Sequence, residues 1–499
     1  MPDRAEVYFE DHKASPDIGR LALRGGIISV AMQYGNGALQ MVAAIILARL
    51  LAPEDFGIVA IITVVTSFAP ALIDFGLGDA TAQRRKIAPS QVSSLFWLST
   101  AIGLIVAIVV AGCNSLIAAV YREPRLGPIA LWTSITFVLW GVSNQHLALL
   151  RRTMRFGAIA RIQLASALVG IVTAISVALC DYGYWALVLR PIANAVCVAC
   201  GAWFMCAWRP GFPVLDDEVR SMLRFGLHVV GFSVTYALAR TVDRIGLGLF
   251  YRPDTIGYYQ NATTLYENSI FEALRQLHTV GSASLSKLQS DPVALRNKYE
   301  AALSAVAFFV MPTAAILSVS AEDITVLLLG EKWRAAGSLL SIIALRGIFQ
   351  VITASQGWLH LSIGRADRWQ SWGIVSLCVQ VAAVIGGLPF GPAGVAAASV
   401  TASLLIAVPS IIYAGRPIDV GFTLLIRAVG PQLIGAISIA AAGWYLRMTI
   451  LSGYSSFARI LLLSVLCSCF YLAVVVGIFR VTEPLKVARA AGTDLLRTR

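Results

Sequence analysis

Long apolar runs separated by short polar segments fill almost the whole chain. Each run has about 20 residues or more, the length of α-helix that crosses a hydrocarbon core of about 30 Å. The pattern therefore predicts fourteen membrane-spanning helices. The runs are 26–50, 57–78, 93–120, 128–150, 158–180, 184–208, 226–250, 257–282, 300–320, 335–363, 370–390, 392–414, 421–446 and 457–479.

The eighth run, 257–282, is the least apolar of the fourteen, because five amide and carboxyl side chains interrupt it. Hydropathy alone leaves two interpretations open, a spanning helix and a helix on the membrane surface. The basic residues favour the first. With the N-terminus assigned to the cytoplasm, the inside segments hold twenty-four Lys and Arg residues, and omitting the eighth helix would invert every later loop. The outside loops hold Arg122, Arg125, Arg252, Lys332 and Arg334. This bias follows the positive-inside rule, so we expect a multi-pass protein of the inner membrane with both termini cytoplasmic.

Composition limits the class of protein in the same way. Apolar residues make up 58% of the chain and charged residues 13%, and the mean hydropathy is +0.75. So few charges cannot cover a water-soluble surface, which excludes a soluble enzyme, a nucleic-acid-binding module and a secreted disulfide scaffold. The eight cysteines lie in or beside apolar runs, where cysteine behaves as a small hydrophobe, so we expect no metal site and no cofactor.

A short pattern recurs at equivalent positions of the two halves. The segment Pro53-Glu54-Asp55-Phe56-Gly57 follows the first run, and Pro253-Asp254-Thr255-Ile256-Gly257 follows the seventh. We expect the proline to end the incoming helix and the glycine to open the next one. Six runs separate the copies, so both halves enter the membrane from the same side, as in transporters built from a parallel repeat.

The predicted fold is therefore all-α and polytopic, with two six-helix lobes around a central cleft and two additional C-terminal helices. Between the lobes we expect an interfacial linker, either a mechanical connection or a passive one. The predicted segments are an N-terminal cytoplasmic segment (1–25), an N-lobe (26–208), the linker (209–225), a C-lobe (226–414), the last two helices (415–480) and a basic cytoplasmic tail (481–499).

Several local sequences carry a resemblance to a known family. They are ILARLLAPEDFG at 46–57, DFGLG at 74–78, MLRFG at 222–226, TVDR at 241–244 with GYY at 257–259, and LLLGEKW at 327–333. In this order and spacing the chain resembles the bacterial polysaccharide flippases of the Wzx type. These belong to the multidrug/oligosaccharidyl-lipid/polysaccharide exporter superfamily, and the overall likeness is to the branch that exports exopolysaccharide, colanic-acid or succinoglycan-type units.

The resemblance implies a function and partners. The substrate would be an undecaprenyl-pyrophosphate-linked oligosaccharide, moved by alternating access for exopolysaccharide or lipopolysaccharide biosynthesis. The partners would be this polyprenyl-linked glycan, the lipid bilayer and, in second place, the polysaccharide polymerase and export machinery, with no nucleic acid. Coupling to an ion gradient is implied by the antiporter relatives.

Polar residues inside the runs are the candidate site. An ionisable group at the centre of a bilayer costs about 2.5–3.5 kcal/mol on insertion scales, so it usually lines a cavity or finds a partner. Arginine binds phosphate oxygens in a bidentate fashion, and amides and tyrosine suit sugar hydroxyls. The residues that we predict to line a substrate cleft are Gln33, Asn36, Gln40, Arg190, Tyr236, Arg240, Arg244, Arg346 and Gln350. The alternative is that they make ordinary polar contacts between helices, worth about 0.6 kcal/mol each.

We expect a different role for each of three acidic residues. Glu267 is the candidate for ion coupling, because a lone acid at membrane depth can titrate. Asp243 is a second candidate, although a structural pair with Arg240 or Arg244 is the stronger expectation. Asp74, near the inner end of the second run, is expected to cap or anchor that helix.

The chain has no P-loop, no paired histidines and no nucleophile elbow, so we predict no enzymatic activity. Three other hypotheses remain open beside the polysaccharide flippase: a cation-coupled exporter of small molecules, a flippase of the lipid II type, and a membrane enzyme of polysaccharide assembly. The last of these normally carries a long outer loop, and the longest outer gap here is 321–334.

Overall fold

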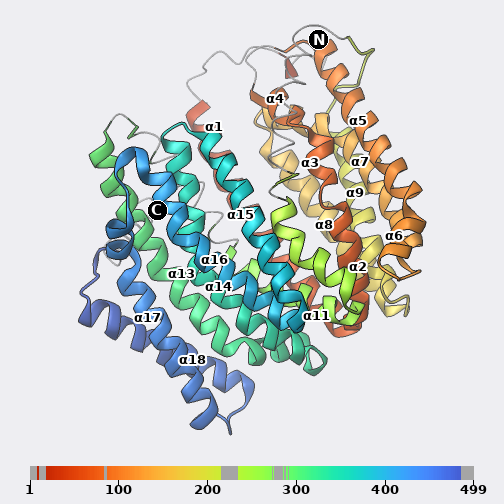
Figure 1. Ribbon diagram of the computed structural model, residues 1–499. Coiled ribbons are helices and arrows are strands. Elements are labelled where there is room, and N and C mark those ends of the chain that lie inside the picture. The colour runs from red at the N-terminus through yellow and green to blue at the C-terminus, as the bar shows by residue number, and fades with distance from the viewer. Residues whose placement is uncertain are drawn as a thin grey trace. The chain divides into compact units, whose positions relative to one another are not determined.

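The computed structural model describes residues 8–9, 18–83, 87–214, 234–235, 237–271, 274, 285, 288–289 and 291–484. In these ranges the regular elements are helices, and each of the fourteen apolar runs is mostly helical where it is described (Figure 1). Ten helical stretches of the described chain are long and apolar enough to cross a membrane. One of these, Asp367–Ile418, covers two of the predicted runs, so the polytopic all-α class is confirmed, while the number fourteen stays a prediction.

The chain divides into two compact units, Met1–Gly257 and Tyr258–Arg499. The predicted segment boundaries, including the linker, stay predictions. The part of the linker after residue 214, where we expect an interfacial helix, lies outside the described residues.

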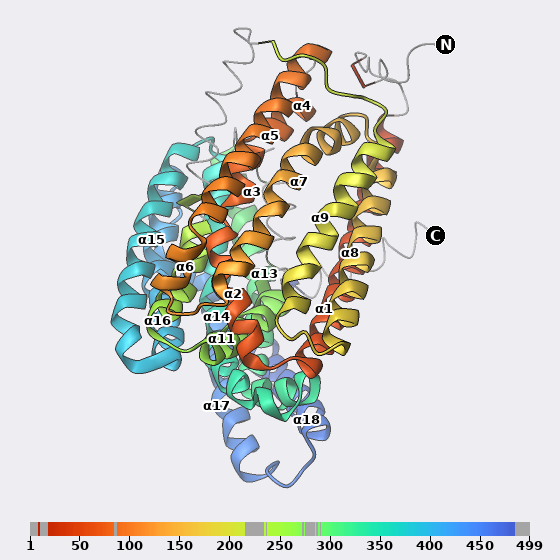
Figure 2. The same ribbon diagram turned by 90° about the vertical axis from the view of Figure 1, so that its right-hand side faces the viewer.

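Unit 1 is built around one central helix. Its helices are α1 (Ile18–Leu50), α2 (Pro53–Thr66), α3 (Ala69–Asp74), α4 (Leu77–Gln83), α5 (Pro89–Gly112), α6 (Asn114–Val120), α7 (Leu126–Arg152), α8 (Phe156–Leu179), α9 (Trp185–Met205) and a helix at 237–250. Helix α7 packs against α2, α4, α5 and α9, while α8 lies between α1 and α9 (Figure 2). The unit is therefore layered, with α7 inside and α1 at one edge.

Glycines allow the closest helix packing in unit 1. A Cβ on Gly103 of α5 would lie 2.5 Å from the carbonyl oxygen of Phe137, and one on Gly141 of α7 would lie 2.7 Å from that of Ser99. Small residues at such positions let two membrane helices approach through their backbones. This explains why α5 and α7 are in contact over much of their length.

The first part of the predicted linker is fixed to α5. The Ser93 hydroxyl accepts from the Gly211 N–H at 3.0 Å, the Ser94 hydroxyl bonds both backbone groups of Val214 at 2.7 Å, and Trp97 Nε1 donates to the Gly211 carbonyl at 2.9 Å. Residues 211–214 thus belong structurally to unit 1.

Unit 2 is organised around α13 (Pro292–Leu329). The remaining elements are most of α11 (Pro253–Tyr266), the π-helix η2 (Glu267–Phe271), η3 (Glu331–Trp333), α14 (Arg334–Ser362), α15 (Ala366–Gly387), η4 (Leu388–Phe390), α16 (Gly391–Gly415), η5 (Arg416–Ile418), α17 (Phe422–Thr449), α18 (Ser456–Leu472) and the π-helix η6 (Ala473–Ile478). Helix α13 begins at a proline that follows an N-cap, since the Asp291 carboxylate accepts from the N–H groups of Val293 and Ala294 at 3.1 and 3.0 Å. It packs against α14, α17 and α18, so the two last helices are part of unit 2.

The two repeat segments begin helices of equal length. Helices α2 and α11 each have 14 residues and start at Pro53 and Pro253. The prolines therefore occupy the first helical position, where their missing N–H is of no consequence. The expectation that the glycine opens the helix was wrong, because Gly57 and Gly257 lie one turn inside it.

An ion cluster outside the spans joins α2 to the start of α7. Arg125 Nε donates to Glu123 Oε1 at 2.7 Å and the same guanidinium pairs with Glu54. The hydrogen bonds from Arg125 hold the pKa of Glu123 below its ordinary value. A depressed folded-state pKa adds stability above the ordinary glutamate pKa, and this stability is lost as pH falls through the folded value.

We therefore expect Glu123→Gln to flatten the acid limb of the stability profile. The measurement is the thermal unfolding midpoint in detergent, from neutral pH down to about pH 3. The control is Asp181→Asn, which removes an exposed carboxylate for which the described chain shows no ion pair. Equal acid limbs for wild type and Glu123→Gln would contradict the assignment.

Candidate functional site

In unit 1, two of the predicted cleft residues meet. Arg190, on α9, donates to the side-chain oxygen of Gln40, on α1. Gly170 lets α8 approach α9 at this level, because a Cβ there would lie 3.0 Å from the Arg190 carbonyl oxygen. In the described part of the chain no carboxylate pairs with this half-buried Arg190, and its side-chain partner is an amide.

Further polar groups lie on the same helices. Asn194, one turn after Arg190, donates to the Ser166 hydroxyl of α8 at 3.3 Å. Asn36, one turn before Gln40, has a buried side-chain oxygen with no hydrogen-bond partner among the described residues. Gln33 lies on α1 as well, but its side chain is outside the described part. The helices α1, α8 and α9 thus place one cation and several amides within an apolar unit.

In unit 2 the corresponding cation is Arg346, on α14. Its Nε is buried, and within the described ranges the side chain has neither a hydrogen bond nor an ion pair. Gln350, one turn later on α14, accepts from the Tyr266 hydroxyl at 3.5 Å. Arg346 is therefore a half-buried cation without a counter-ion, in a helix apolar enough to span a membrane.

The helix at 237–250 carries three of the predicted residues. Asp243 is buried, and its Oδ1 accepts from the backbone N–H of Arg244 at 2.8 Å. The side chains of Arg240 and Arg244 are half-buried, and both residues have further interactions. Tyr236 lies outside the described residues. The pairing of Asp243 with Arg240 or Arg244, and the roles of these residues, stay predictions.

Glu267 stands at an irregular point of the backbone. It is the first residue of the π-helix η2, which directly continues α11, and its side chain is half-buried. On the same face of α11, Gln260 Nε2 donates to the Thr264 hydroxyl at 3.1 Å. Single π-helical turns are frequent at functional sites, which agrees with the choice of Glu267 as the coupling candidate but does not test it.

The anchoring role of Asp74 is confirmed. Its Oδ1 accepts from the Gly78 N–H at 3.3 Å and from Asn144 Nδ2 at 3.0 Å. The carboxylate thus links the end of α3 to α4 and to α7.

Sequence reasoning missed a buried ionic network in unit 2. Arg447 of α17 pairs with Glu322 of α13, and its Nε lies 3.5 Å from Asp323 Oδ2. Arg459 of α18 lies 3.5 Å from the other Asp323 oxygen, and Ser338 of α14 donates to Glu322 at 2.9 Å. The apolar runs end at 320 and 446, so Glu322, Asp323 and Arg447 looked like loop residues, although α13 and α17 continue past them.

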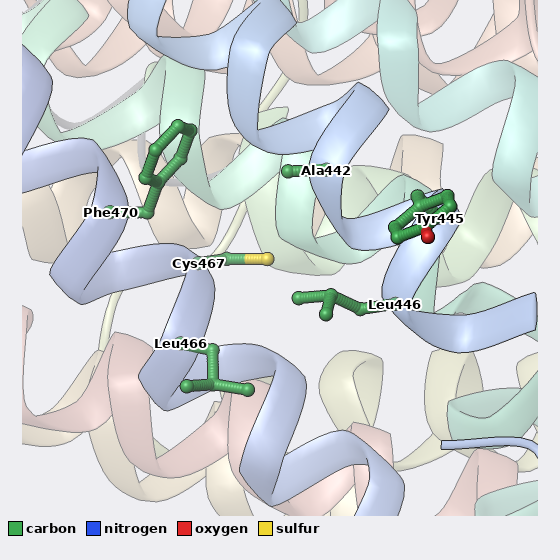
Figure 3. A pocket seen from close by; sticks show the side chains of 6 residues that line it. All are labelled: Ala442, Tyr445, Leu446, Leu466, Cys467 and Phe470. Carbon is green, nitrogen blue, oxygen red and sulfur yellow. The ribbon is translucent and has the colours of Figure 1, made fainter. Parts of the chain in front are cut away.

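A pocket of about 300 Å³ lies between α17 and α18 (Figure 3). Its lining is almost wholly apolar, and the single hydroxyl is that of Tyr445. The lining residues are Ala442, Tyr445, Leu446, Leu466, Cys467 and Phe470. Such a surface cannot replace the hydration of phosphates or sugars, so the pocket does not suit a charged head group.

Comparison with known proteins agrees with this picture. Residues 46–338 match the family model described as "Polysaccharide biosynthesis protein". The lipopolysaccharide biosynthesis protein WzxC of Escherichia coli is 25% identical over 74% of this chain and 75% of its own length. The succinoglycan biosynthesis transport protein ExoT of Rhizobium meliloti is 22% identical over 72% of this chain and 73% of its own.

Solved structures show the same fold at low identity. The lipid II flippase MurJ, in an inward closed conformation, matches 91% of this chain and 99% of its own with a TM-score of 0.69 and 15% identity. An inward-facing multidrug resistance transporter of the MATE family matches 78% of this chain and 95% of its own, with a TM-score of 0.57 and 14% identity. The likeness predicted from the sequence, to exporters of this superfamily, is confirmed.

Proposed function

Since this chain belongs to the polysaccharide biosynthesis protein family, we propose that it is a flippase for a polyprenyl-diphosphate-linked oligosaccharide. The relatives named for lipopolysaccharide biosynthesis and for succinoglycan transport support a glycan substrate. The observation that carries the proposal is a pair of half-buried arginines without carboxylate partners in the described chain, Arg190 in unit 1 and Arg346 in unit 2.

The physical argument concerns the missing counter-ions. An unpaired cation at membrane depth is unfavourable, so its retention indicates that an anion or water reaches it during function. A diphosphate supplies the anion, and a guanidinium binds two of its oxygens at once. Gln40, Asn36, Asn194 and Gln350 then offer amide groups to the sugar hydroxyls. A neutral, apolar molecule would leave both charges uncompensated.

The transport step needs no covalent chemistry. The diphosphate of the lipid-linked glycan binds to an arginine guanidinium, the protein changes conformation, and the head group is released on the other side. Glu267 is the proposed coupling carboxylate, and Asp243 is kept as the second candidate. We also propose the orientation with both termini cytoplasmic and a location in the inner membrane, on the basis of the basic inside segments.

The test is a flipping assay in proteoliposomes with a fluorescent undecaprenyl-diphosphate oligosaccharide. We expect protein-dependent access of the labelled glycan to a membrane-impermeant quencher or glycosidase. The same vesicles should not export a neutral hydrophobic drug. Export of the drug with no flipping of the glycan would replace the proposal with the small-molecule exporter, and flipping of lipid II in preference to the oligosaccharide would replace the substrate.

A further inference from the structure

The first turns of α2 and α11 are in direct backbone contact, through the two glycines of the repeat. A Cβ on Gly57 would lie 1.6 Å from the carbonyl oxygen of Pro253. A Cβ on Gly257 would lie 1.9 Å from the carbonyl oxygen of Pro53. The contact is reciprocal, because each glycine packs on the proline of the other copy. We call these four residues, all of them in unit 1, the glycine crossing.

The glycines are required for space and not for backbone conformation. Neither Gly57 nor Gly257 is among the residues with positive φ, so an alanine could adopt the same backbone angles. What an alanine cannot do is occupy the position, since separations below about 3 Å are not found for real Cβ atoms and the opposing atoms are backbone. The methyl group of an alanine at either position must therefore push the first turns of α2 and α11 apart.

The acidic residues of the repeat fit the same contact. Two helix N-termini that approach each other bring two partial positive charges together, which is unfavourable. Glu54 and Asp55 lie in the first turn of α2, and Asp254 lies in the first turn of α11. Their carboxylates offset the two dipoles. The crossing is thus a small backbone-to-backbone contact flanked by carboxylates.

Helix α11 starts at this contact and continues into unit 2, since the boundary between the units falls after Gly257. The repeat thus ties the first turn of α11 to the first turn of α2. We propose that the glycine crossing is a gate contact, which breaks and re-forms in every transport cycle at the extracytoplasmic end of the spans. This inference rests on the proposed function and orientation, and it assigns Gly57 and Gly257 as positioning residues for the conformational change.

The experiment measures the contact and the transport separately. Spin labels are placed at Ala52 and Arg252, the two exposed residues that precede the prolines, in a variant without native cysteines. We expect a short-distance population in the wild type, its loss in Gly57→Ala and Gly257→Ala, and at least a tenfold reduction of the flipping rate in both. Gly112→Ala is the control, because a Cβ at that helical position meets nothing within 4 Å.

A second variant covers the case in which the alanine proteins do not fold. Cysteines at 52 and 252, joined by a cleavable bifunctional thiol reagent, should stop flipping, and cleavage of the reagent should restore it. Unchanged label distances in Gly57→Ala, or normal flipping by the cross-linked protein, would overturn the gate. The wild type could also flip no glycan while the label distances still respond to Gly57→Ala. In that case the proposed function is wrong, and the inference that the contact opens and closes is kept.

Discussion

The Arg346→Ala variant is expected to lose flipping at least tenfold while keeping, or raising, its thermal stability. The two effects have one cause. Arg346 is half-buried with no partner in the described chain, so removing it relieves an unfavourable partial burial of charge. The same change takes away the cation that we assign to the substrate diphosphate. If Arg346 were retained for packing, its replacement by alanine would lower the thermal stability.

Two further variants sharpen this prediction. Arg346→Lys keeps the charge but not the planar fork, so we expect intermediate flipping. Arg161→Ala is the matched control, since Arg161 is an exposed arginine of an apolar helix that donates only to the Gly157 carbonyl oxygen. The measurements are the flipping rate in proteoliposomes and the unfolding midpoint in detergent. Full flipping by Arg346→Ala, or a clear loss of its stability, would count against a substrate role.

The second large effect concerns stability alone. Arg447→Ala should destabilise unit 2 by about 3–5 kcal/mol, because it leaves the buried Asp323 and the half-buried Glu322 with one cation fewer. The cation–π contact of Arg447 with Trp444, at 5.3 Å, is lost as well. The measurement is unfolding in detergent with increasing denaturant.

An exposed ion pair on the same unit provides the comparison. Arg334 lies 2.7 Å from Glu331, with 58% and 69% of the two side chains exposed, and Arg334→Ala should change the free energy of unfolding far less than Arg447→Ala does. The double variant Arg447→Met with Glu322→Gln should recover much of the stability, since Arg459 still pairs with Asp323. An equal effect of Arg447→Ala and Arg334→Ala would show that the network is solvated.

The sequence predicted the helices well, because a membrane imposes one simple rule on their length and polarity. It predicted their ends less well. The runs at 300–320 and 421–446 end where charges begin, whereas α13 and α17 continue to Leu329 and Thr449. Charged residues in these last turns satisfy one another across helices, and no local pattern reveals partners that are distant in sequence, such as Asp323 and Arg459.

In the candidate site, too, some features could be predicted from the sequence and others could not. Burial of Arg190 and Arg346 followed from their place in apolar runs. That Gln40 would receive the Arg190 guanidinium, while Arg346 would receive no partner from the described chain, depends on how α1, α9 and α14 pack. The repeat at Pro53 and Pro253 was visible as a motif. The reciprocal contact could not be predicted from the sequence. The reason for a glycine at each position becomes clear only when the structure shows which backbone atom lies opposite it.

The length of α13 has a practical consequence. Its 38 residues, at about 1.5 Å each, give a rod of nearly twice the hydrocarbon thickness, bent at most at Pro312. The first turns expose Arg296 and Lys298 on one face and bury Leu295 and Tyr299 on the other, so this stalk extends beyond the hydrocarbon while it stays packed on unit 2. A fluorophore on that stalk would report the tilt of the whole unit in an intact vesicle without touching the membrane interior.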